Sequence, residues 1–227
     1  VVRCTISCMP SQPNKVELIG FYGSDESHAL SAWTSTSREL TEDKKSRIPQ
    51  LLKMLAENGH GTPFEKSSIH FLVTTDISSH IQLCKHRIGV SINASSARYK
   101  ELKEDNCYVP YDWPPEEQEL YVEHMTSSFQ KYHATLDRLV QGGMSRKRAK
   151  ESARLYLPYG NQITADVMFN FRSFVHFLRL RYSEHAQVEI RDIAKSMLDL
   201  VVSTGDFKHT LEAFGLTING ELRGPFV

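Results

Sequence analysis

Apolar and polar residues follow two different periods along this chain. Residues 15–22 are expected to form a strand, and residues 68–75 alternate with a period of two, which predicts a second strand. Between them we expect a helix capped by Asp25 that runs through Trp33, and a second helix over residues 47–57. In the second helix the apolar residues lie three to four positions apart, and Asn58-Gly59 supplies a stop signal.

From Asp76 onwards the sequence pattern predicts mostly helices. Asp76 is expected to cap a helix that carries Ile77, Ile81 and Cys84, and Pro114-Pro115 opens a long helix that Gly142-Gly143 closes. Further helices are expected over residues 145–156, 164–182 and 184–202, with a short one near residue 211. There is no internal repeat or long linker, so we predict one α+β domain over residues 1–227 in which helices dominate.

Composition narrows the class of protein. The 227 residues carry 27 basic and 27 acidic side chains, so the chain offers no overall basic field for nucleic acid. There is no run of eighteen apolar residues and no signal-peptide pattern, so a cytoplasmic protein is expected. The four cysteines form no C-x-x-C pairs, which favours reduced thiols over disulfides or a metal site.

Residues 82–99 hold the densest cluster of chemically active groups. Lys85, His86, Arg87 and Arg98 lie there among several serines, a composition suited to binding anions. The segment resembles the signature of the flavin-dependent thymidylate synthases, in which Arg-His-Arg is followed after seven residues by Ser and continues into Ser-x-Arg-Tyr.

The segment departs from that signature at three points. Lys85 replaces the first arginine, Ala94 replaces an acidic residue, and one residue is inserted between the two halves. Counting forward from Arg87 makes Ser95 the motif serine, whereas counting back from the Arg-Tyr ending makes it Ser96. We favour Ser96, because the slip is more easily absorbed at the glycine of residues 88–90.

Three other segments resemble the same family, in the expected order. Residues 58–65 resemble its His-x-Thr-Pro-Phe-Glu stretch, although read alone His60 is a solvated histidine in a tight turn. Residues 151–158 resemble Glu-x-Ala-Arg…Leu-Pro, although Glu151 and Arg154 can equally form a surface ion pair. Residues 170–189 resemble Asn-x-Arg-Ser…Leu-Arg…His-Ala-Gln-x-Glu.

The last of these segments has an unusual helical pattern. Asn170 and Arg181 fall on one side of the expected helix, while Arg172 and His176 fall nearly opposite. Cations on two faces of an apolar helix need anionic partners on both, because an unpaired buried charge is costly. An oligomer with a different ligand on each face would supply them. Alternatively, the arginines pair with carboxylates, for which the candidates are Glu151, Glu184 and Glu189.

The resemblance implies a fold, an activity and a set of residues. The fold would be that of the thymidylate synthase-complementing proteins, a mixed or antiparallel sheet flanked by long helices. The activity would be reductive methylation of dUMP to dTMP in a homotetramer with shared active sites, with FAD, NADPH and methylenetetrahydrofolate. Arg181 and Ser96 would be catalytic. The dUMP-binding residues would be Gln82, Lys85, Ser95 or Ser96, Arg98, Arg154 and Arg181, and the FAD-binding residues would be His60, Thr62, Lys85, His86, Arg87, Asn170, Arg172 and His176.

Two alternatives stay open on sequence grounds. The same fold could modify another pyrimidine nucleotide or install hydroxymethyl instead of methyl. A nucleotide- or RNA-binding module without chemistry is the other alternative, and the neutral net charge counts against it. No cysteine has the context of an enzyme nucleophile, so a route without cysteine addition is expected.

Overall fold

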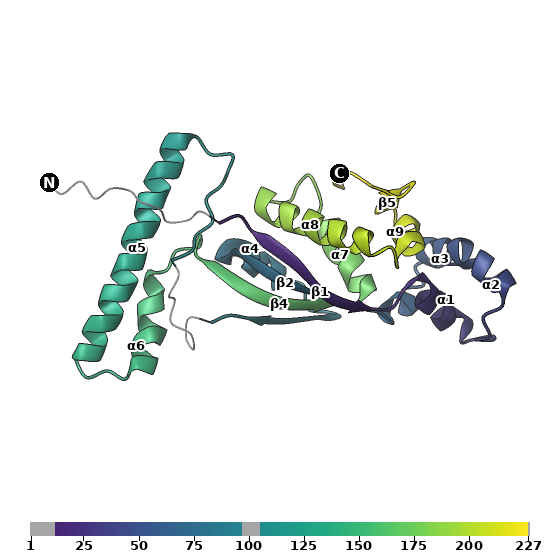
Figure 1. The fold of residues 1–227 in the computed structure, drawn as a ribbon, viewed down its shortest axis with the longest axis horizontal. Coiled ribbons are helices and arrows are strands. Elements are labelled where there is room, and N and C mark those ends of the chain that lie inside the picture. The colour runs from purple at the N-terminus through teal and green to yellow at the C-terminus, as the bar shows by residue number, and fades with distance from the viewer. Residues whose placement is uncertain (1–11, 97–104, 227) are drawn as a thin grey trace. The chain divides into compact units, whose positions relative to one another are not determined.

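The computed structural model describes residues 12–96 and 105–226. Four strands form one sheet in the order β1-β2-β4-β3 (Figure 1). Their bounds are β1 Lys15–Tyr22, β2 Ser68–Asp76, β3 Val90–Ala94 and β4 Gln162–Phe169. A small antiparallel pair consists of β5 (Thr217–Ile218) and β6 (Glu221–Leu222). The fold combines helices with an antiparallel sheet, which confirms the α+β prediction.

The chain falls into two compact units, each assembled from separate stretches of sequence. The first takes Val1–Lys15, Thr74–Gln82 and Ala94–Ala165, as far as these are described. The second takes Val16–Val73, Leu83–Asn93 and Asp166–Val227. Residues of β2 and β4 therefore belong to both units.

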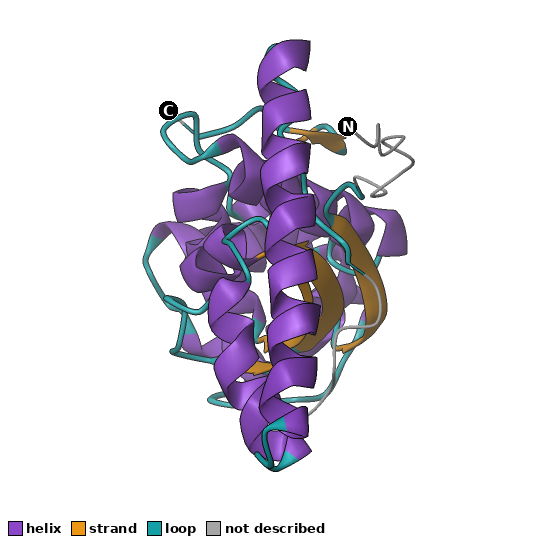
Figure 2. Cartoon of the chain, turned by 90° about the vertical axis from the view of Figure 1, so that its left-hand side faces the viewer, coloured by secondary structure: helices purple, strands orange, loops and turns teal. Residues whose placement is uncertain are grey.

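Helix α5 (Pro115–Gln141) dominates the first unit and packs against α6 (Arg146–Ala153), as Figure 2 shows. The short helix η2 (Arg154–Tyr156) continues from α6, and α4 (Ile77–Leu83) follows β2. Between α5 and α6 lies a cluster of apolar side chains that are almost fully buried: Tyr132, Leu136, Ala149 and Ala153. This burial gives the helix pair its stability, since α6 by itself is too short to persist.

The second unit contains α1 (Asp25–Trp33), α3 (Ile48–Glu57), η1 (Thr62–Glu65), α7 (Phe171–Arg181), α8 (Val188–Thr204) and α9 (Lys208–Ala213). Helix α3 packs against α1 and α9, while α7 packs against α8 and η1. A group of aromatic rings fills the space between them with edge, tilted and stacked contacts: Phe64, Phe171, Phe207 and Phe214.

His28 lies inside this aromatic group and is fully buried. Its two ring nitrogens are 3.0 Å from Oγ1 of Thr210 and 2.8 Å from Oγ of Ser67, so both are satisfied. Asp25 completes the connection by accepting from the backbone N–H groups of His209 and Thr210. These polar contacts tie α1, the start of β2 and α9 into one structure.

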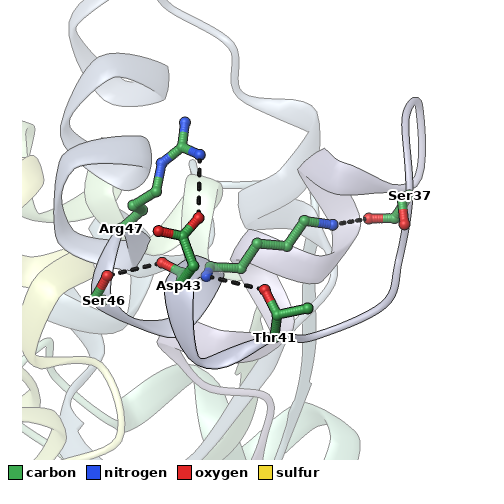
Figure 3. A network of polar contacts seen from close by, with 6 residues as sticks. Ser37, Thr41, Asp43, Ser46 and Arg47 are labelled. Carbon is green, nitrogen blue, oxygen red and sulfur yellow. Dashed lines mark hydrogen bonds and ion pairs between the residues drawn. The ribbon is translucent and has the colours of Figure 1, made fainter.

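The sequence did not predict helix α2 (Glu42–Ser46), which has no buried residue and is held by local polar contacts (Figure 3). Oγ1 of Thr41 accepts from the backbone N–H of Lys44 at 3.3 Å, and the Lys44 ammonium donates to the carbonyl of Ser37. An ion pair of 3.6 Å joins Arg47 to Asp43. Hydrophobic spacing does not reveal a helix of this kind.

The predicted helix over residues 164–182 is wrong in its first half. Residues 162–169 form strand β4, in which buried Ala165, Val167 and Phe169 alternate with exposed Asp166 and Met168. Asn170 then caps α7, because its side chain accepts from the backbone N–H of residue 173 at 2.8 Å. The strand is followed directly by the helix, so the apolar pattern of the sequence does not separate the two.

Smaller differences concern helix ends. Helix α8 begins at Val188 and not at residue 184, because Ala186 donates to the carbonyl of Ser183 in a turn. Cys84 lies beyond the end of α4 and is exposed, so the prediction that this helix carries Cys84 on its apolar face is wrong.

In the described ranges, no helix combines the length and apolarity that crossing a bilayer requires.

Candidate functional site

Two hollows lie in the second unit, and both are lined by α7. The first, which we call the signature hollow, has a volume of about 210 Å³. It is bounded by the turn after α4, the start of β3 and one side of α7. Its lining residues are Lys85, His86, Arg87, Ile88, Val90, Ser173, His176, Leu180 and Arg181. Five predicted site residues therefore line a single hollow: Lys85, His86, Arg87, His176 and Arg181.

His86 and Arg181 form the most specific contact of the signature hollow. Nε of Arg181 donates to Nε2 of His86 at 3.0 Å. Arginine has no acceptor, so this geometry assigns Nε2 as the accepting nitrogen and leaves the proton of the neutral ring on Nδ1. Burial, with the nearby Arg181 and His176, lowers the pKa of His86 to about 4. At neutral pH His86 is therefore an uncharged donor with a fixed tautomer.

The turn at Ile88-Gly89 is fastened to the beginning of α7. Oγ of Ser173 donates to the carbonyl of Ile88 at 2.7 Å, and the N–H of Asn170 donates to the carbonyl of Gly89 at 3.0 Å. Gly89 has a φ of 65°, and a Cβ there would lie 2.2 Å from Nδ2 of Asn170. Only glycine can both adopt this positive φ and leave room for the Asn170 side chain. Asn170, predicted to bind FAD, thus caps α7 and supports the signature turn.

The second hollow, which we call the turn hollow, has a volume of about 240 Å³. It lies among α3, the turn before η1, and α7. Its lining residues are Leu55, Ala56, Gly59, His60, Gly61, Phe64, Arg172, Val175, His176, Arg179 and Phe214. Three residues predicted to bind FAD line it: His60, Arg172 and His176. Thr62, also predicted, is exposed at the first position of η1 and lines neither hollow.

Arg172 is held at the edge of the turn hollow. Its Nη1 lies 2.7 Å from Oε1 of Glu65, and the two side chains are 56% and 36% exposed. A Cβ on Gly61 would lie 2.6 Å from Nε of Arg172, so any side chain at residue 61 would displace the guanidinium from this position. The predicted alternative partners of Arg172 (Glu151, Glu184 or Glu189) are wrong, since its carboxylate is Glu65.

Residues on neighbouring faces of helix α7 line the two hollows. Arg172, His176 and Arg179 occupy positions i, i+4 and i+7, which places them on one face towards the turn hollow. His176 also lines the signature hollow, where its ring centroid lies 6.0 Å from that of His86. His86 thus contacts both His176 and Arg181. The predicted separation of α7 into two opposed ligand faces is wrong for His176 and Arg181, which line one hollow together.

The remaining predicted residues belong to the first unit, except Arg98, which lies outside the described residues. Ser95 is engaged by β4, since its Oγ accepts from the backbone N–H of Thr164 at 3.0 Å. Ser96 and Gln82 are half-buried, and Arg154 is exposed at the start of η2. Glu151 pairs with Arg148 at 3.7 Å.

Several residues that line or support the hollows were not predicted from the sequence, and four of them bear on the site. Ser173 and Leu180 line the signature hollow, Arg179 lines the turn hollow, and Glu65 holds Arg172. Arg179 could have been found from the sequence, because its spacing places it on the same helix face as Arg172 and His176. Among the described residues, no three His, Cys, Asp or Glu side chains gather into a possible metal site.

Two adjoining hollows rich in cations and imidazoles are typical of proteins that bind nucleotides and dinucleotide cofactors. Residues 17–204 match the model of the family described as thymidylate synthase complementing protein. The chain belongs to this family.

Individual relatives agree with this assignment. The chain is 28% identical to a flavin-dependent thymidylate synthase of Streptomyces coelicolor over 82% of its own length and 81% of the relative's. It is 32% identical to a flavin-dependent thymidylate synthase of Thermotoga neapolitana, over 79% and 81%. Among solved structures, the UMP/dUMP methylase PolB from Streptomyces cacaoi bound with 5-Br dUMP superposes with a TM-score of 0.76. It is 27% identical, and the match covers 93% of this chain and 98% of PolB.

Proposed function

We propose that this protein is a flavin-dependent thymidylate synthase that converts dUMP to dTMP. Methylenetetrahydrofolate would supply the carbon of the new methyl group, and NADPH would supply the electrons through FAD. The observation that carries the proposal is the signature hollow, where Arg181 and a neutral, tautomer-fixed His86 lie together. Membership of the family and relatives named for this activity give further support.

The residues of the signature hollow suit a flavin ring. Its edge carries carbonyl oxygens and unprotonated ring nitrogens, which accept hydrogen bonds and therefore require donors. Nδ1–H of His86 is such a donor, and Arg87 and His176 are exposed side chains on the same hollow. When bound, the flavin supplies hydride-transfer chemistry that no side chain can supply. His86, Arg87 and His176 would hold and orient it.

Arg181 would polarise the pyrimidine. Methylation at C5 of uracil requires electron density at C5, and a guanidinium beside the uracil carbonyl and N3 stabilises the charge that develops there. Partial burial lowers the pKa of Arg181, but an arginine stays charged at neutral pH. The His86 contact fixes the direction of its Nε–H. Gln82, Lys85, Ser96, Arg98 and Arg154 would bind the rest of dUMP, mainly its phosphate.

A cysteine nucleophile has no support in the described residues. Burial raises the pKa of the Cys107 thiol. Desolvation also raises the pKa of the Cys84 thiol, and it outweighs the opposing effect of Lys85. Both thiols are therefore protonated at neutral pH, whereas a nucleophile needs the thiolate. This favours the proposed route without cysteine addition.

We also propose a homotetramer that shares active sites between subunits, as the family resemblance implies. Both hollows of the second unit are open and lined by exposed cations, so a ligand bound in one would still expose much of its surface. A second subunit would cover that surface. Light scattering of the purified protein tests the subunit number, and a monomer with full activity would overturn this part of the proposal.

A second candidate function is methylation of UMP as well as dUMP. The likeness to PolB, named a UMP/dUMP methylase, favours it. So do the departures in the signature, since Lys85 offers a point charge where arginine would offer two directed donors. Ala94 removes an acceptor from the same segment. A broader nucleotide pocket is the expected result.

One set of measurements separates these possibilities. Purified protein should show the visible absorbance of a flavin, and denaturation should release FAD identified by mass. Anaerobic assays with dUMP, UMP and dCMP would then identify the methylated product by mass. A colourless protein that takes up no added FAD, but binds polynucleotide with steep salt dependence, would instead establish a nucleic-acid-binding module.

A further inference from the structure

The end of the chain, yellow in Figure 1, returns from α9 to the C-terminal end of α7. We call residues 216–226 the C-terminal strap. Leu216 at its start is almost fully buried, and β5 and β6 form a hairpin whose two turn residues, Asn219 and Gly220, have φ of 54° and 81°. The N–H of Arg223 donates to the carbonyl of Leu216 at 3.0 Å and extends the ladder of the hairpin. The strap is therefore a folded element of the second unit.

The far end of the strap pairs with the residues that follow α7. The N–H of Phe226 donates to the carbonyl of Tyr182 at 2.9 Å, and the N–H of Glu184 donates to the carbonyl of Phe226 at 2.8 Å. These two bonds form a short parallel β-bridge. The Tyr182 hydroxyl adds a third bond by donating to the carbonyl of Arg223 at 3.1 Å. Three hydrogen bonds thus hold the strap against one turn of the chain.

Tyr182 connects these contacts to the proposed active site. It is the C-cap of α7, its side chain is buried, and its backbone N–H donates to the carbonyl of Leu178 at 2.7 Å. Arg181, the last residue of the helix, precedes it directly. Helix ends fray unless their last residues are held from outside the helix. The strap supplies this hold, and it fixes the backbone from which Arg181 extends.

The contact between Arg181 and His86 depends on that backbone. The arginine side chain has several rotatable bonds, so its Nε meets Nε2 of His86 at 3.0 Å only while the end of α7 keeps its place. His86 holds the guanidinium, and the strap holds the main chain behind it. The family model matches residues 17–204, so the strap lies outside the matched part. The motifs of the family therefore contain no information about this second hold.

We propose that the C-terminal strap positions Arg181 for its action on the pyrimidine, and that Tyr182 is the positioning residue through which the strap acts. The inference rests on the proposed function, because that function gives Arg181 its role at the uracil. Tyr182 and Phe226 are not among the lining residues of the signature hollow, so their effect on turnover is exerted through Arg181.

Phe226→Pro tests the proposal, with Phe226→Ala as its matched control. Both variants lose the ring that Arg223 faces at 5.4 Å, but only proline also loses the N–H that donates to Tyr182. Relative to Phe226→Ala, Phe226→Pro should lower kcat for dUMP by about fivefold, the usual net effect of losing one hydrogen bond. Tyr182→Phe, which removes only the hydroxyl, should change kcat in the same direction.

A second readout follows the contact between Arg181 and His86 directly and needs no substrate. Burial, and after it the charge of Arg181, lowers the pKa of His86 to about 4. When Arg181 moves away, the pKa of His86 should rise, and the proton should no longer be confined to Nδ1. An NMR titration with labelled ring nitrogens measures both effects in the two Phe226 variants and in the wild type.

Equal kcat in the two Phe226 variants would overturn the proposal. So would a lower kcat in Phe226→Pro with His86 signals as in the wild type, or a lower melting temperature with kcat unchanged. If Phe226→Pro does not fold, Tyr182→Phe decides by the same two readouts, with the exposed Tyr22→Phe as its control. A wild-type protein that methylates no pyrimidine nucleotide would refute the proposed function, whereas the His86 titration would still decide whether the strap holds Arg181.

Discussion

Nε of Arg181 donates to Nε2 of His86 at 3.0 Å, although the two residues are 95 positions apart in the chain. Each residue fixes a property of the other. The arginine decides which imidazole nitrogen carries the proton, and the imidazole decides where the guanidinium points. The pair therefore links the orientation of the proposed pyrimidine-polarising group to the protonation of a proposed flavin-binding group.

The first prediction concerns Arg181. Arg181→Ala should reduce turnover of dUMP by about 100-fold or more, because a preorganised charge at the uracil is lost. Flavin absorbance should stay largely intact. Arg191→Ala, on α8 and lining neither hollow, is the control and should retain activity. Normal turnover of Arg181→Ala would remove this residue from the mechanism.

The second prediction concerns Gly61, whose φ of −74° any residue can adopt. Gly61→Ala should therefore preserve the backbone but push the Arg172 guanidinium away, since the new Cβ would lie 2.6 Å from its Nε. We expect weaker FAD binding with little change in unfolding free energy. Gly20→Ala is the matched control, because nothing lies within 4 Å of a Cβ there. Equal FAD affinity in both variants would contradict the assignment of Arg172 to the cofactor.

The third prediction separates the two candidate motif serines. Ser96→Ala should raise the Kd for dUMP more than Ser95→Ala. The latter should mainly cost stability, by about 1 kcal/mol, because the backbone N–H of Thr164 loses its acceptor. Titration calorimetry and urea unfolding measure the two effects. The reverse order of dUMP affinities would place the inserted residue elsewhere in the segment.

The fourth prediction concerns acid stability. Burial lowers the pKa of His28 from 6.5 to about 4, so the unfolded chain binds a proton at a higher pH than the folded chain. The stability that neutral His28 contributes is complete above pH 6.5 and is lost as the pH falls towards 4, by at most about 3 kcal/mol. His86 has a similar pKa and adds to the loss in the same window.

Melting temperatures measured between pH 4 and pH 7.5 test this prediction. His28→Asn should melt lower at pH 7 but show a flatter dependence on pH than the wild type. If the variant does not fold, the His28 ring can be titrated directly by NMR in the wild-type protein. A midpoint near 6.5 would contradict the predicted effect of burial.

Sequence reasoning located most helices and five of the residues that line the signature hollow, because hydrophobic spacing and local motifs carry that information. It failed at β4, where the alternation of Ala165, Val167 and Phe169 runs straight into the apolar face of α7. The capping role of Asn170 was the signal that would have separated them. It also could not find the Glu65 partner of Arg172, since residues 107 positions apart meet only in the folded chain.

Arg179 shows a different limit of prediction from the sequence. Its spacing from Arg172 and His176 is visible in the sequence, but a charged residue on a helix is most often a solvated one. Only the hollow that these three side chains line together distinguishes a binding role from a surface role.

His176 belongs to both hollows, so a single side chain is exposed to whatever fills either of them. This makes it a natural spectroscopic reporter. With the ring labelled, an NMR titration could follow phosphate-containing fragments and flavin-ring fragments separately, through the same pair of signals. Unequal displacements of those signals would show which of the two hollows each fragment occupies.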